Sequence, residues 1–353
     1  MYFFYEKVYC VFCVLQYIYI KHDYKTVIVR KMKMQSGENT ILTNGSFRLD
    51  DHWVWCGSPV VDGDKVRLYA SAWSKEYPMF EGYVLHSTIV LATADEIEGK
   101  YRLEKEIFPG KHSSLQMAHN PAVRYYNRKW YMFFIASPAM EGCDVNNPDH
   151  INSVYSKIAI YLAEASAPAG PWVLREKPIL EARPGKWDAS IVTNPAPCIL
   201  DDGRVFLYYR SNTPQGLRIG LAVAQNVDSV FERYGDEPVL SGADVEDPFV
   251  WHDGKKFGMV AKDMTGNLTG ELHSGAKFVS DDGINWRCEG KAYSRTVSDR
   301  SGNVTTFGSL ERPQLLFDAD GNPEYLFAAV ADGPGGFRKA ANTWNICLDI
   351  KQK

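Results

Sequence analysis

Short apolar runs, paired across tight polar turns, are the dominant pattern of this chain. In the segment Val245–Asp263, the runs Phe249–Trp251 and Phe257–Ala261 flank an Asp-Gly dipeptide. Asp-Gly between two apolar runs is a strong hairpin signal, so two antiparallel strands are predicted here. Pro248 cannot donate a hydrogen bond to a sheet, and we expect it to be the first residue of its strand.

The same pattern returns four more times, less regularly. Each copy has an apolar run with a proline, a turn and a second apolar run, and the copies begin at Ser58-Pro59, Asn120-Pro121, Ala196-Pro197 and Arg312-Pro313. The prolines are roughly 50 to 75 residues apart, which matches the repeat length of a propeller blade with inserted loops. We therefore predict an all-β fold, a five-bladed β-propeller of four-stranded antiparallel blades. A β-sandwich with turn-rich linkers is the alternative.

The N-terminal segment is unlike the rest of the chain. Residues 1–43 are expected to be an extension, disordered or non-native, ahead of a single propeller domain at residues 44–353. The apolar run Val8–Ile20 is shorter than the roughly 20 residues that span a bilayer, and no small-residue cleavage site of a secretory signal follows it. We favour a native start at Met32 or Met34. The sequence does not fix the cellular location; the cytoplasm is favoured over secretion, and no membrane partner is expected.

Composition narrows the classes of function. The 353 residues carry a net charge of −4 with both signs mixed, so no basic stripe is present and no nucleic-acid partner is expected. Aromatic residues make up 13% of the chain, with 9 Trp and 20 Tyr, which suits either a protein that stacks on sugar rings or simply an aromatic-rich β protein. The seven cysteines are scattered, and neither a disulfide framework nor a zinc site at Cys10-x-x-Cys13 is predicted. Nothing indicates the oligomeric state.

Acidic and polar residues stand just before the prolines of several repeats. If every repeat starts the innermost strand of its blade, these residues meet at one end of the central channel. The acidic candidates are Glu246, Asp247 and Glu311, and the polar candidates are His119, Asn120, Asn194 and Arg312. A carboxylate beside a guanidinium is normally pulled towards ionisation, whereas a general acid needs burial or a like charge to oppose this pull.

Three candidate features each allow two interpretations. Trp53 and Trp55 lie two residues apart on a predicted strand and point to the same face, either as a stacking platform for a sugar ring or as core. His119 is either a substrate-binding residue or a satisfied core histidine. Asp188, which lies ahead of the third repeat, is either a site residue or a turn residue.

These motifs resemble those of the five-bladed β-propeller glycosidases, glycoside hydrolase family 43 and its relatives in families 32, 68 and 117. Glu246-Asp247-Pro248 resembles the Arg-Asp-Pro motif of the fructan-active members, whose Asp stabilises the transition state. Glu311-Arg312-Pro313 resembles the Glu-Arg-Pro of levansucrases, whose Glu is the general acid. The segment Val54–Pro59 resembles the first-blade segment that holds the Asp nucleophile or base, but Cys56 or Ser58 takes the place of that Asp.

The resemblance implies a glycoside hydrolase that cleaves an oligo- or polysaccharide with carboxylates at one pole of the channel. Glu311 is the expected general acid, and Asp247 the group that stabilises positive charge. The candidates for the base are Asp188, Asp51 and Asp50, with Glu246 as a fourth, and Asp188 or Asp51 is the expected one. Substrate contacts are expected from Asp51, Trp53, Trp55, His119, Asn120, Asn194, Glu246, Lys262 and Arg312.

The same motifs bear on cofactors and on two alternative functions. No cofactor is expected to be required; the resemblance allows a structural calcium ion in the central channel, which no ligand cluster in the sequence demands. Because the first-blade Asp is missing, a propeller that binds carbohydrate without cleaving it is one alternative. The other is a scaffold of Trp-Asp repeats, but its repeats of about 40–45 residues and its Gly-His…Trp-Asp signature are absent from this chain.

Overall fold

The computed structural model describes residues 40–110 and 114–351, in which the strands form five sheets. The expectations for the N-terminal segment up to residue 39, including Cys10 and Cys13, fall outside these ranges. Blade 1 consists of β2 (His52–Asp62), β3 (Lys65–Ser74), β4 (Thr88–Ala94) and β5 (Arg102–Phe108). Blade 2 consists of β6 (Leu115–Tyr126), β7 (Lys129–Pro138), β8 (Ala159–Ala165) and β9 (Val173–Leu174).

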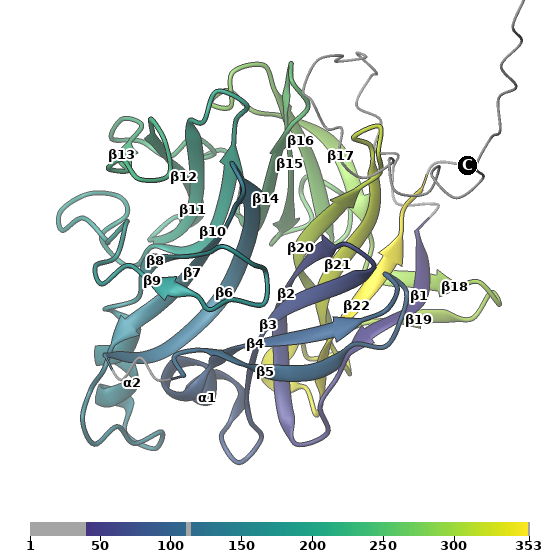
Figure 1. Ribbon diagram of the computed structural model, residues 1–353, viewed down its shortest axis with the longest axis horizontal. Coiled ribbons are helices and arrows are strands. Elements are labelled where there is room, and N and C mark those ends of the chain that lie inside the picture. Colours follow the sequence, from purple (N-terminus) through teal and green to yellow (C-terminus); the bar gives the residue numbers. More distant parts are fainter. Residues whose placement is uncertain (1–39, 111–113, 352–353) are drawn as a thin grey trace, which may run out of the picture. The chain divides into compact units, whose positions relative to one another are not determined.

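The remaining blades follow the same order. Blade 3 consists of β10 (Thr193–Ile199), β11 (Val205–Thr213), β12 (Gly216–Ala224) and β13 (Glu232–Arg233). Blade 4 consists of β14 (Val245–His252), β15 (Phe257–Asp263), β16 (Gly275–Ser280) and β17 (Arg287–Tyr293). Blade 5 consists of β20 (Ser309–Phe317), β21 (Pro323–Ala331), β22 (Thr343–Asp349) and β1 (Ile41–Phe47). The predicted five-bladed propeller of antiparallel, four-stranded blades is therefore confirmed (Figure 1).

The first strand of the domain closes the ring. β1 pairs with β22 in antiparallel register, with Leu42 opposite Leu348, so the beginning of the domain completes its last blade. A hairpin of β18 (Thr296–Asp299) and β19 (Val304–Thr306) extends this blade, with β18 parallel to β1. Because β1 begins at Ile41, the propeller includes residues ahead of the boundary expected at Asn44.

Every blade starts with a bulged strand. β2, β6, β10, β14 and β20 are the innermost strands, and those of neighbouring blades pack against one another. The expectation that Pro248 begins its strand is wrong, because it lies inside β14 at a shift of register between Glu246 and Phe249. A bulge leaves a residue unpaired, which is why a proline is tolerated there.

The residue at each bulge has left-handed backbone geometry. Its φ angle is 51° to 58° at five equivalent positions, Cys56, Asn120, Asn194, Asp247 and Arg312. Positive φ is uncommon for residues other than glycine, and bulges near active sites serve to redirect a side chain. The bulges therefore turn one side chain of each blade towards the middle of the ring.

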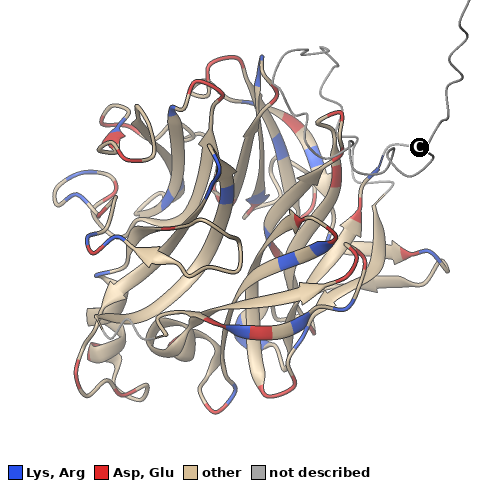
Figure 2. Cartoon of the chain, in the orientation of Figure 1, with Lys and Arg blue, Asp and Glu red and all other residues tan. Residues whose placement is uncertain are grey.

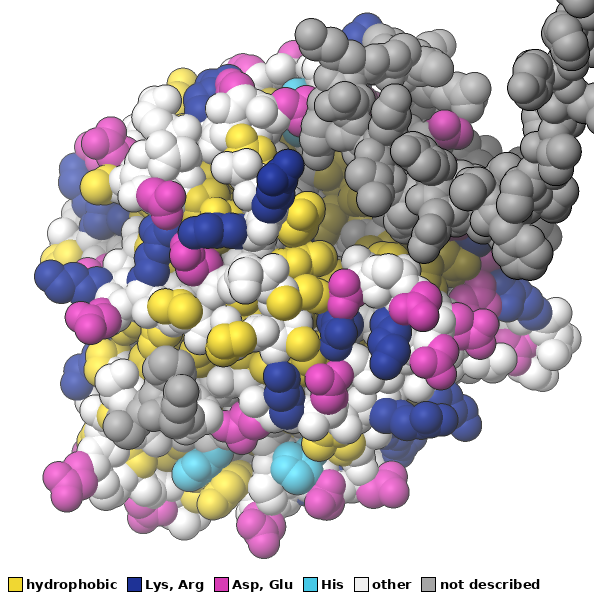
Figure 3. All heavy atoms as spheres, viewed as in Figure 1, with side chains coloured by type: hydrophobic (Ala, Val, Ile, Leu, Met, Phe, Trp, Pro, Cys, Tyr) yellow, Lys and Arg dark blue, Asp and Glu magenta, His cyan; other side chains and the backbone are white. Residues whose placement is uncertain are grey.

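The core lies between neighbouring blades. Phe133 of blade 2 and Leu207 of blade 3, for example, are both fully buried in one cluster that joins the two sheets. Each such side chain contributes about 1.5–3 kcal/mol when removed from water. On the face seen in Figure 3, hydrophobic side chains gather near the middle and charged ones surround them. Figure 2 shows Lys, Arg, Asp and Glu spread over all blades without a stripe of one sign.

Two inserted helices lie beside each other near the lower edge of the view in Figure 1. α1 (Met79–His86) connects β3 to β4, and α2 (Pro148–Tyr155) connects β7 to β8. They pack together through Val84, Leu85, Ile151 and Val154. A short 3₁₀ helix, η2 (Phe337–Lys339), lies in the loop between β21 and β22. None of the helices within the described ranges has the length and apolar character that crossing a membrane requires.

Candidate functional site

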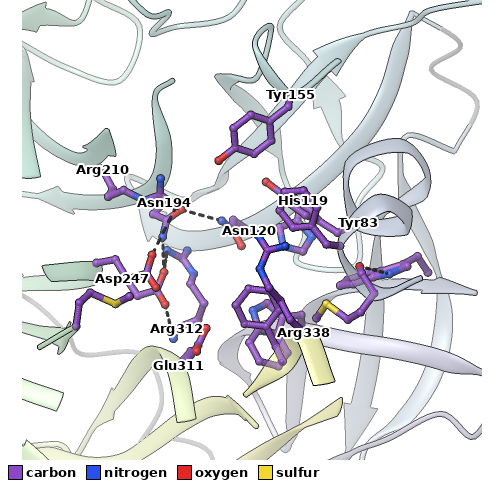
Figure 4. A pocket seen from close by; sticks show the side chains of 17 residues that line it. Tyr83, His119, Asn120, Tyr155, Asn194, Arg210, Asp247, Glu311, Arg312 and Arg338 are labelled. Carbon is purple, nitrogen blue, oxygen red and sulfur yellow. Dashed lines mark hydrogen bonds and ion pairs between the residues drawn. The ribbon is translucent and has the colours of Figure 1, made fainter. Parts of the chain in front are cut away.

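A pocket of about 350 Å³, a volume typical of small-molecule sites, lies beside the bulges of blades 2 to 5 (Figure 4). One wall is aromatic and comes mainly from blade 1, α1, α2 and η2. The other is charged and comes from blades 3, 4 and 5. The lining side chains are Trp55, Trp73, Met79, Phe80, Tyr83, His119, Asn120, Tyr155, Asn194, Arg210, Glu246, Asp247, Met264, Glu311, Arg312, Phe337 and Arg338.

The charged wall holds three carboxyl groups. Glu246 and Asp247 come from β14 and Glu311 from β20, and one oxygen of each lies within 4.8 Å of the others. Lys262 lies opposite Glu246 in the β14–β15 register, which places its ammonium between two of them. Lys262 Nζ is 3.1 Å from Glu246 Oε1 and 2.6 Å from Glu311 Oε1. The structure thus brings together four residues that the sequence predicted for one site.

The environments of two neighbouring carboxyl groups push their pKa values apart. Burial and the negative charge of Glu246 raise the pKa of Asp247 to about 7, against the opposing effect of Arg312. Burial also acts to raise the pKa of Glu246, but Lys262 and Arg210 outweigh it and the pKa is lowered. Near neutral pH Glu246 is therefore ionised, whereas Asp247 exchanges its proton readily.

The five bulge residues form a chain of hydrogen bonds that crosses all blades. Cys56 Sγ lies 2.5 Å from Asn120 Oδ1, and Asn120 Nδ2 donates to Asn194 Oδ1 at 3.2 Å. Asn194 Nδ2 in turn donates to Asp247 Oδ1. Arg312 reaches Asp247 twice, from its backbone N–H to Oδ2 at 3.2 Å and from Nη1 to Oδ1 at 3.5 Å. Asp247 is thus fixed in place from two neighbouring blades.

Cys56 of blade 1 and His119 of blade 2 form a neutral pair. Cys56 Sγ is 3.6 Å from His119 Nε2, and His119 Nδ1 is 2.7 Å from Ser87 Oγ. Burial raises the pKa of the Cys56 thiol well above its ordinary value and lowers that of His119 well below. The pair is therefore thiol and neutral imidazole, not thiolate and imidazolium. Ser58 accepts a hydrogen bond from the backbone N–H of Val123, which is a structural role.

The two tryptophans proposed as a stacking platform have different positions. Trp55 lines the pocket, with its ring 5.9 Å from that of Phe337. Trp53 does not line it; its indole N–H donates to the carbonyl of Tyr77, and Lys75 lies over its ring. Of these two tryptophans, Trp55 is the one placed to contact a bound sugar.

The two expected bases lie outside the pocket. Asp188 is fully buried, and its carboxylate accepts from Arg183 Nε at 2.9 Å, Tyr209 OH at 2.9 Å and Arg233 Nε at 3.2 Å. These three donors hold it inside blade 3, which corrects the prediction that it approaches the channel. The side chain of Asp51 is 83% exposed and pairs with His52, away from the lining residues.

Several lining residues were not predicted as site residues. Phe80 and Tyr83 lie on α1, in a loop whose length and aromatic content were the available signal. Tyr155 ends α2, in the polar insertion after β7. Arg338 lies on η2, where no motif marks it. All four belong to insertions rather than to the repeated strands.

A calcium ion does not fit the residues at this end of the channel. The carboxyl oxygens of Glu246, Asp247 and Glu311 are close enough to bind one ion together. However, the ammonium of Lys262 already bridges two of them, and the guanidinium of Arg312 pairs with the third. A divalent cation would have to displace two fixed positive charges, so no chemical step is assigned to a metal.

Comparison with known proteins identifies the fold but no sequence family. No family model matches the sequence, and no curated protein matches it. Zg3597, a family 117 glycoside hydrolase of the marine bacterium Zobellia galactanivorans, superposes with a TM-score of 0.65 at 14% identity, over 91% of this chain and 92% of that chain. The complex of BT0996 with RGII gives a TM-score of 0.63 at 12% identity, over 89% of this chain and 91% of the matched one.

A thermostable family-43 glycoside hydrolase gives a TM-score of 0.57 at 15% identity, over 90% of this chain and 92% of that chain. Because these structures are matched over nearly their whole length, the likeness covers the complete ring of blades. The chain therefore has the five-bladed β-propeller fold of the family 117 and family 43 glycoside hydrolases.

Proposed function

We propose that this protein is a glycoside hydrolase whose reaction takes place at the charged wall of the pocket. The observation that carries the proposal is the convergence of Glu246, Asp247 and Glu311, with the pKa of Asp247 raised to about 7 and that of Glu246 lowered. Neighbouring carboxyl groups with separated pKa values are typical of acid–base catalysis. The fold shared with glycoside hydrolases supports the same class of reaction.

Asp247 is the proposed proton donor. Its pKa of about 7 is close to the optimum for a general acid near neutral pH, and it lines the pocket. Glu311 forms an ion pair with Lys262 at 2.6 Å, which suits it to act as the charged partner. This exchanges the two roles expected from the motifs, where Glu311 was the acid and Asp247 the stabilising charge.

The spacing of the carboxyl groups sets the expected stereochemistry. Retaining glycosidases hold their two carboxyl groups about 5–5.5 Å apart, and inverting enzymes about 6.5–9.5 Å apart. One oxygen from each carboxyl group lies within 4.8 Å of the others, which favours the closer, retaining spacing. In this scheme Glu311 attacks the anomeric carbon while the leaving oxygen takes the proton of Asp247. Asp247 then removes a proton from the water that hydrolyses the glycosyl ester and releases Glu311.

Substitution of the two carboxyl groups tests the proposal. We expect Asp247→Asn and Glu311→Gln each to lower turnover by about 10²–10⁴ on aryl glycosides and oligosaccharides while the thermal unfolding transition is kept. Asp281→Asn, on an exposed turn of the same blade as Asp247, is the matched control and should retain turnover. Full activity in either pocket variant would refute the assignment. The anomer of the first product, read by NMR, tests retention.

A carbohydrate-binding protein without hydrolytic activity is the second candidate. It is favoured by one observation, the neutral pair of Cys56 on blade 1 and His119 on blade 2, because Cys56 stands where the enzymes that the motifs resemble place a carboxylate. This candidate predicts saccharide binding by calorimetry with no release of reducing ends. It also predicts that Asp247→Asn and Glu311→Gln change affinity alone.

A further inference from the structure

Positive charge exceeds negative charge around the pocket. Arg210, Arg312 and Arg338 line it, and Lys262 lies directly behind the charged wall. They face three carboxyl groups, of which Asp247 has a pKa of about 7 and so carries only part of a charge at neutral pH. The excess includes Arg338, which is exposed to solvent, and an anionic group of a ligand would offset it on binding.

Two of the arginines also have donors without acceptors. Arg312 is only 3% exposed, and its Nε and Nη2 have no oxygen or nitrogen acceptor among the described residues, although its guanidinium also interacts with the Cys56 thiol. Arg210 Nε is likewise buried and without a partner in that part of the chain. Unsatisfied buried donors are costly, and those beside a pocket favour a ligand that brings acceptors.

The third arginine is held at the mouth without an anionic partner. Arg338 is exposed, its guanidinium lies 4.3 Å from the ring centre of Phe80, and it forms no ion pair with a carboxylate of the described residues. Its neighbour Phe337 donates its backbone N–H to Ser309 Oγ at 3.2 Å and packs its ring on Trp55. Stacking and anchoring hold Arg338 over the pocket, as Figure 4 shows.

We propose that the sugar bound in this pocket is acidic and that Arg338 binds its carboxylate or sulfate group. The planar guanidinium fork matches such oxyanions, and a charged sugar substituent would offset the excess positive charge around the pocket. A neutral sugar would leave that excess in place while the reaction adds positive charge at the anomeric centre. This inference rests on the proposed function, because it names the substrate class of the same pocket, but binding alone can test it.

Calorimetry with matched pairs of sugars provides the test. Galacturonic acid is compared with galactose, glucuronic acid with glucose, and galactose 6-sulfate with galactose, at one fixed ionic strength. We expect at least one acidic sugar to bind about 10- to 100-fold more tightly than its neutral partner, as expected for a charge-assisted contact. The carboxylate and sulfate arms show which oxyanion the site prefers.

A pair of variants localises the effect. Arg338→Gln should remove most of the preference for the acid, and Arg338→Lys should keep part of it. Lys339→Gln is the matched control, because Lys339 lies on the same η2 helix but does not line the pocket. It should keep the preference.

The outcomes separate this inference from the proposed function. Equal binding of acidic and neutral sugars, a preference that survives Arg338→Gln, or binding of inorganic phosphate and sulfate without any acidic sugar would each overturn it. Arg338-dependent binding of an acidic sugar by a protein that cleaves no glycoside would support it and reject the hydrolase. Efficient cleavage of neutral glycosides alone would support the proposed hydrolase activity and overturn the inference that the bound sugar is acidic.

Discussion

The bulge of blade 1 and the bulges of blades 4 and 5 have the same backbone geometry and opposite chemistry. In blades 4 and 5 the bulge residues are Asp247 and Arg312, each preceded by a glutamate. In blade 1 the bulge residue is Cys56, preceded by Trp55, and the φ angle is nearly the same. The repeated bulge therefore delivers side chains to one place, whereas the residue type in each blade decides whether its wall is ionic or apolar.

The largest expected effect is the loss of the lysine behind the charged wall. Lys262→Met leaves the carboxylates of Glu246 and Glu311 without their ammonium partner inside the protein. Breaking a buried ion pair in this way typically costs about 3–5 kcal/mol, so we expect the free energy of unfolding in urea to fall by about that amount. Lys256→Met removes an exposed pair with Asp281 and should cost less than about 1 kcal/mol. Equal losses would contradict the picture of a buried ionic wall.

The pH dependence of catalysis should report on Asp247. Its pKa is raised from the ordinary value to about 7, so its protonated form is present below pH 7 and is lost as the pH rises. With Asp247 as general acid, kcat/KM should fall about tenfold per pH unit above roughly pH 7. The residual activity of Asp247→Asn should lack this limb. A profile that stays flat up to pH 9 in the unsubstituted enzyme would rule out this role.

The smallest expected effect is that of substituting Cys56 on blade 1. Because the Cys56 thiol is un-ionised and buried, Cys56→Ala should leave turnover nearly unchanged and cost about 1 kcal/mol of stability for the lost contact with Asn120. Cys198→Ala, at a buried thiol of blade 3, is the comparison for stability. A loss of turnover of 10² or more in Cys56→Ala alone would show that blade 1 takes part in the chemistry.

Sequence reasoning predicted the ring because blades repeat. Each pair of apolar runs indicates a local hairpin. Glu246, Asp247 and Glu311 occupy equivalent points of two repeats, and this was enough to predict that they lie close together. The bulge was missed, since an extra unpaired residue leaves no mark on the apolar pattern. In blades 2 to 5 a proline directly after the bulge residue was its trace, and Pro248 was assigned to the start of its strand instead.

The remaining errors concern side-chain direction and insertions. Asp188 is close to its repeat in sequence, but Arg183, Tyr209 and Arg233 turn its carboxylate into blade 3, and such partners are set only by tertiary packing. Arg338 reaches the pocket through a loop whose path depends on anchors elsewhere in blade 5. Residues on repeated strands could therefore be placed from the sequence, and residues on connections could not.

The pairing of β1 with β22 also has a consequence for how the protein is made. Leu42 and Leu348 meet across the seam, so the last sheet joins segments from opposite ends of the domain. Contacts of such long sequence separation form late and slow folding. During synthesis on the ribosome, blades 1 to 4 can emerge and pair one by one, but we expect Glu311 to take its place beside Asp247 only after nearly all of the domain has been translated.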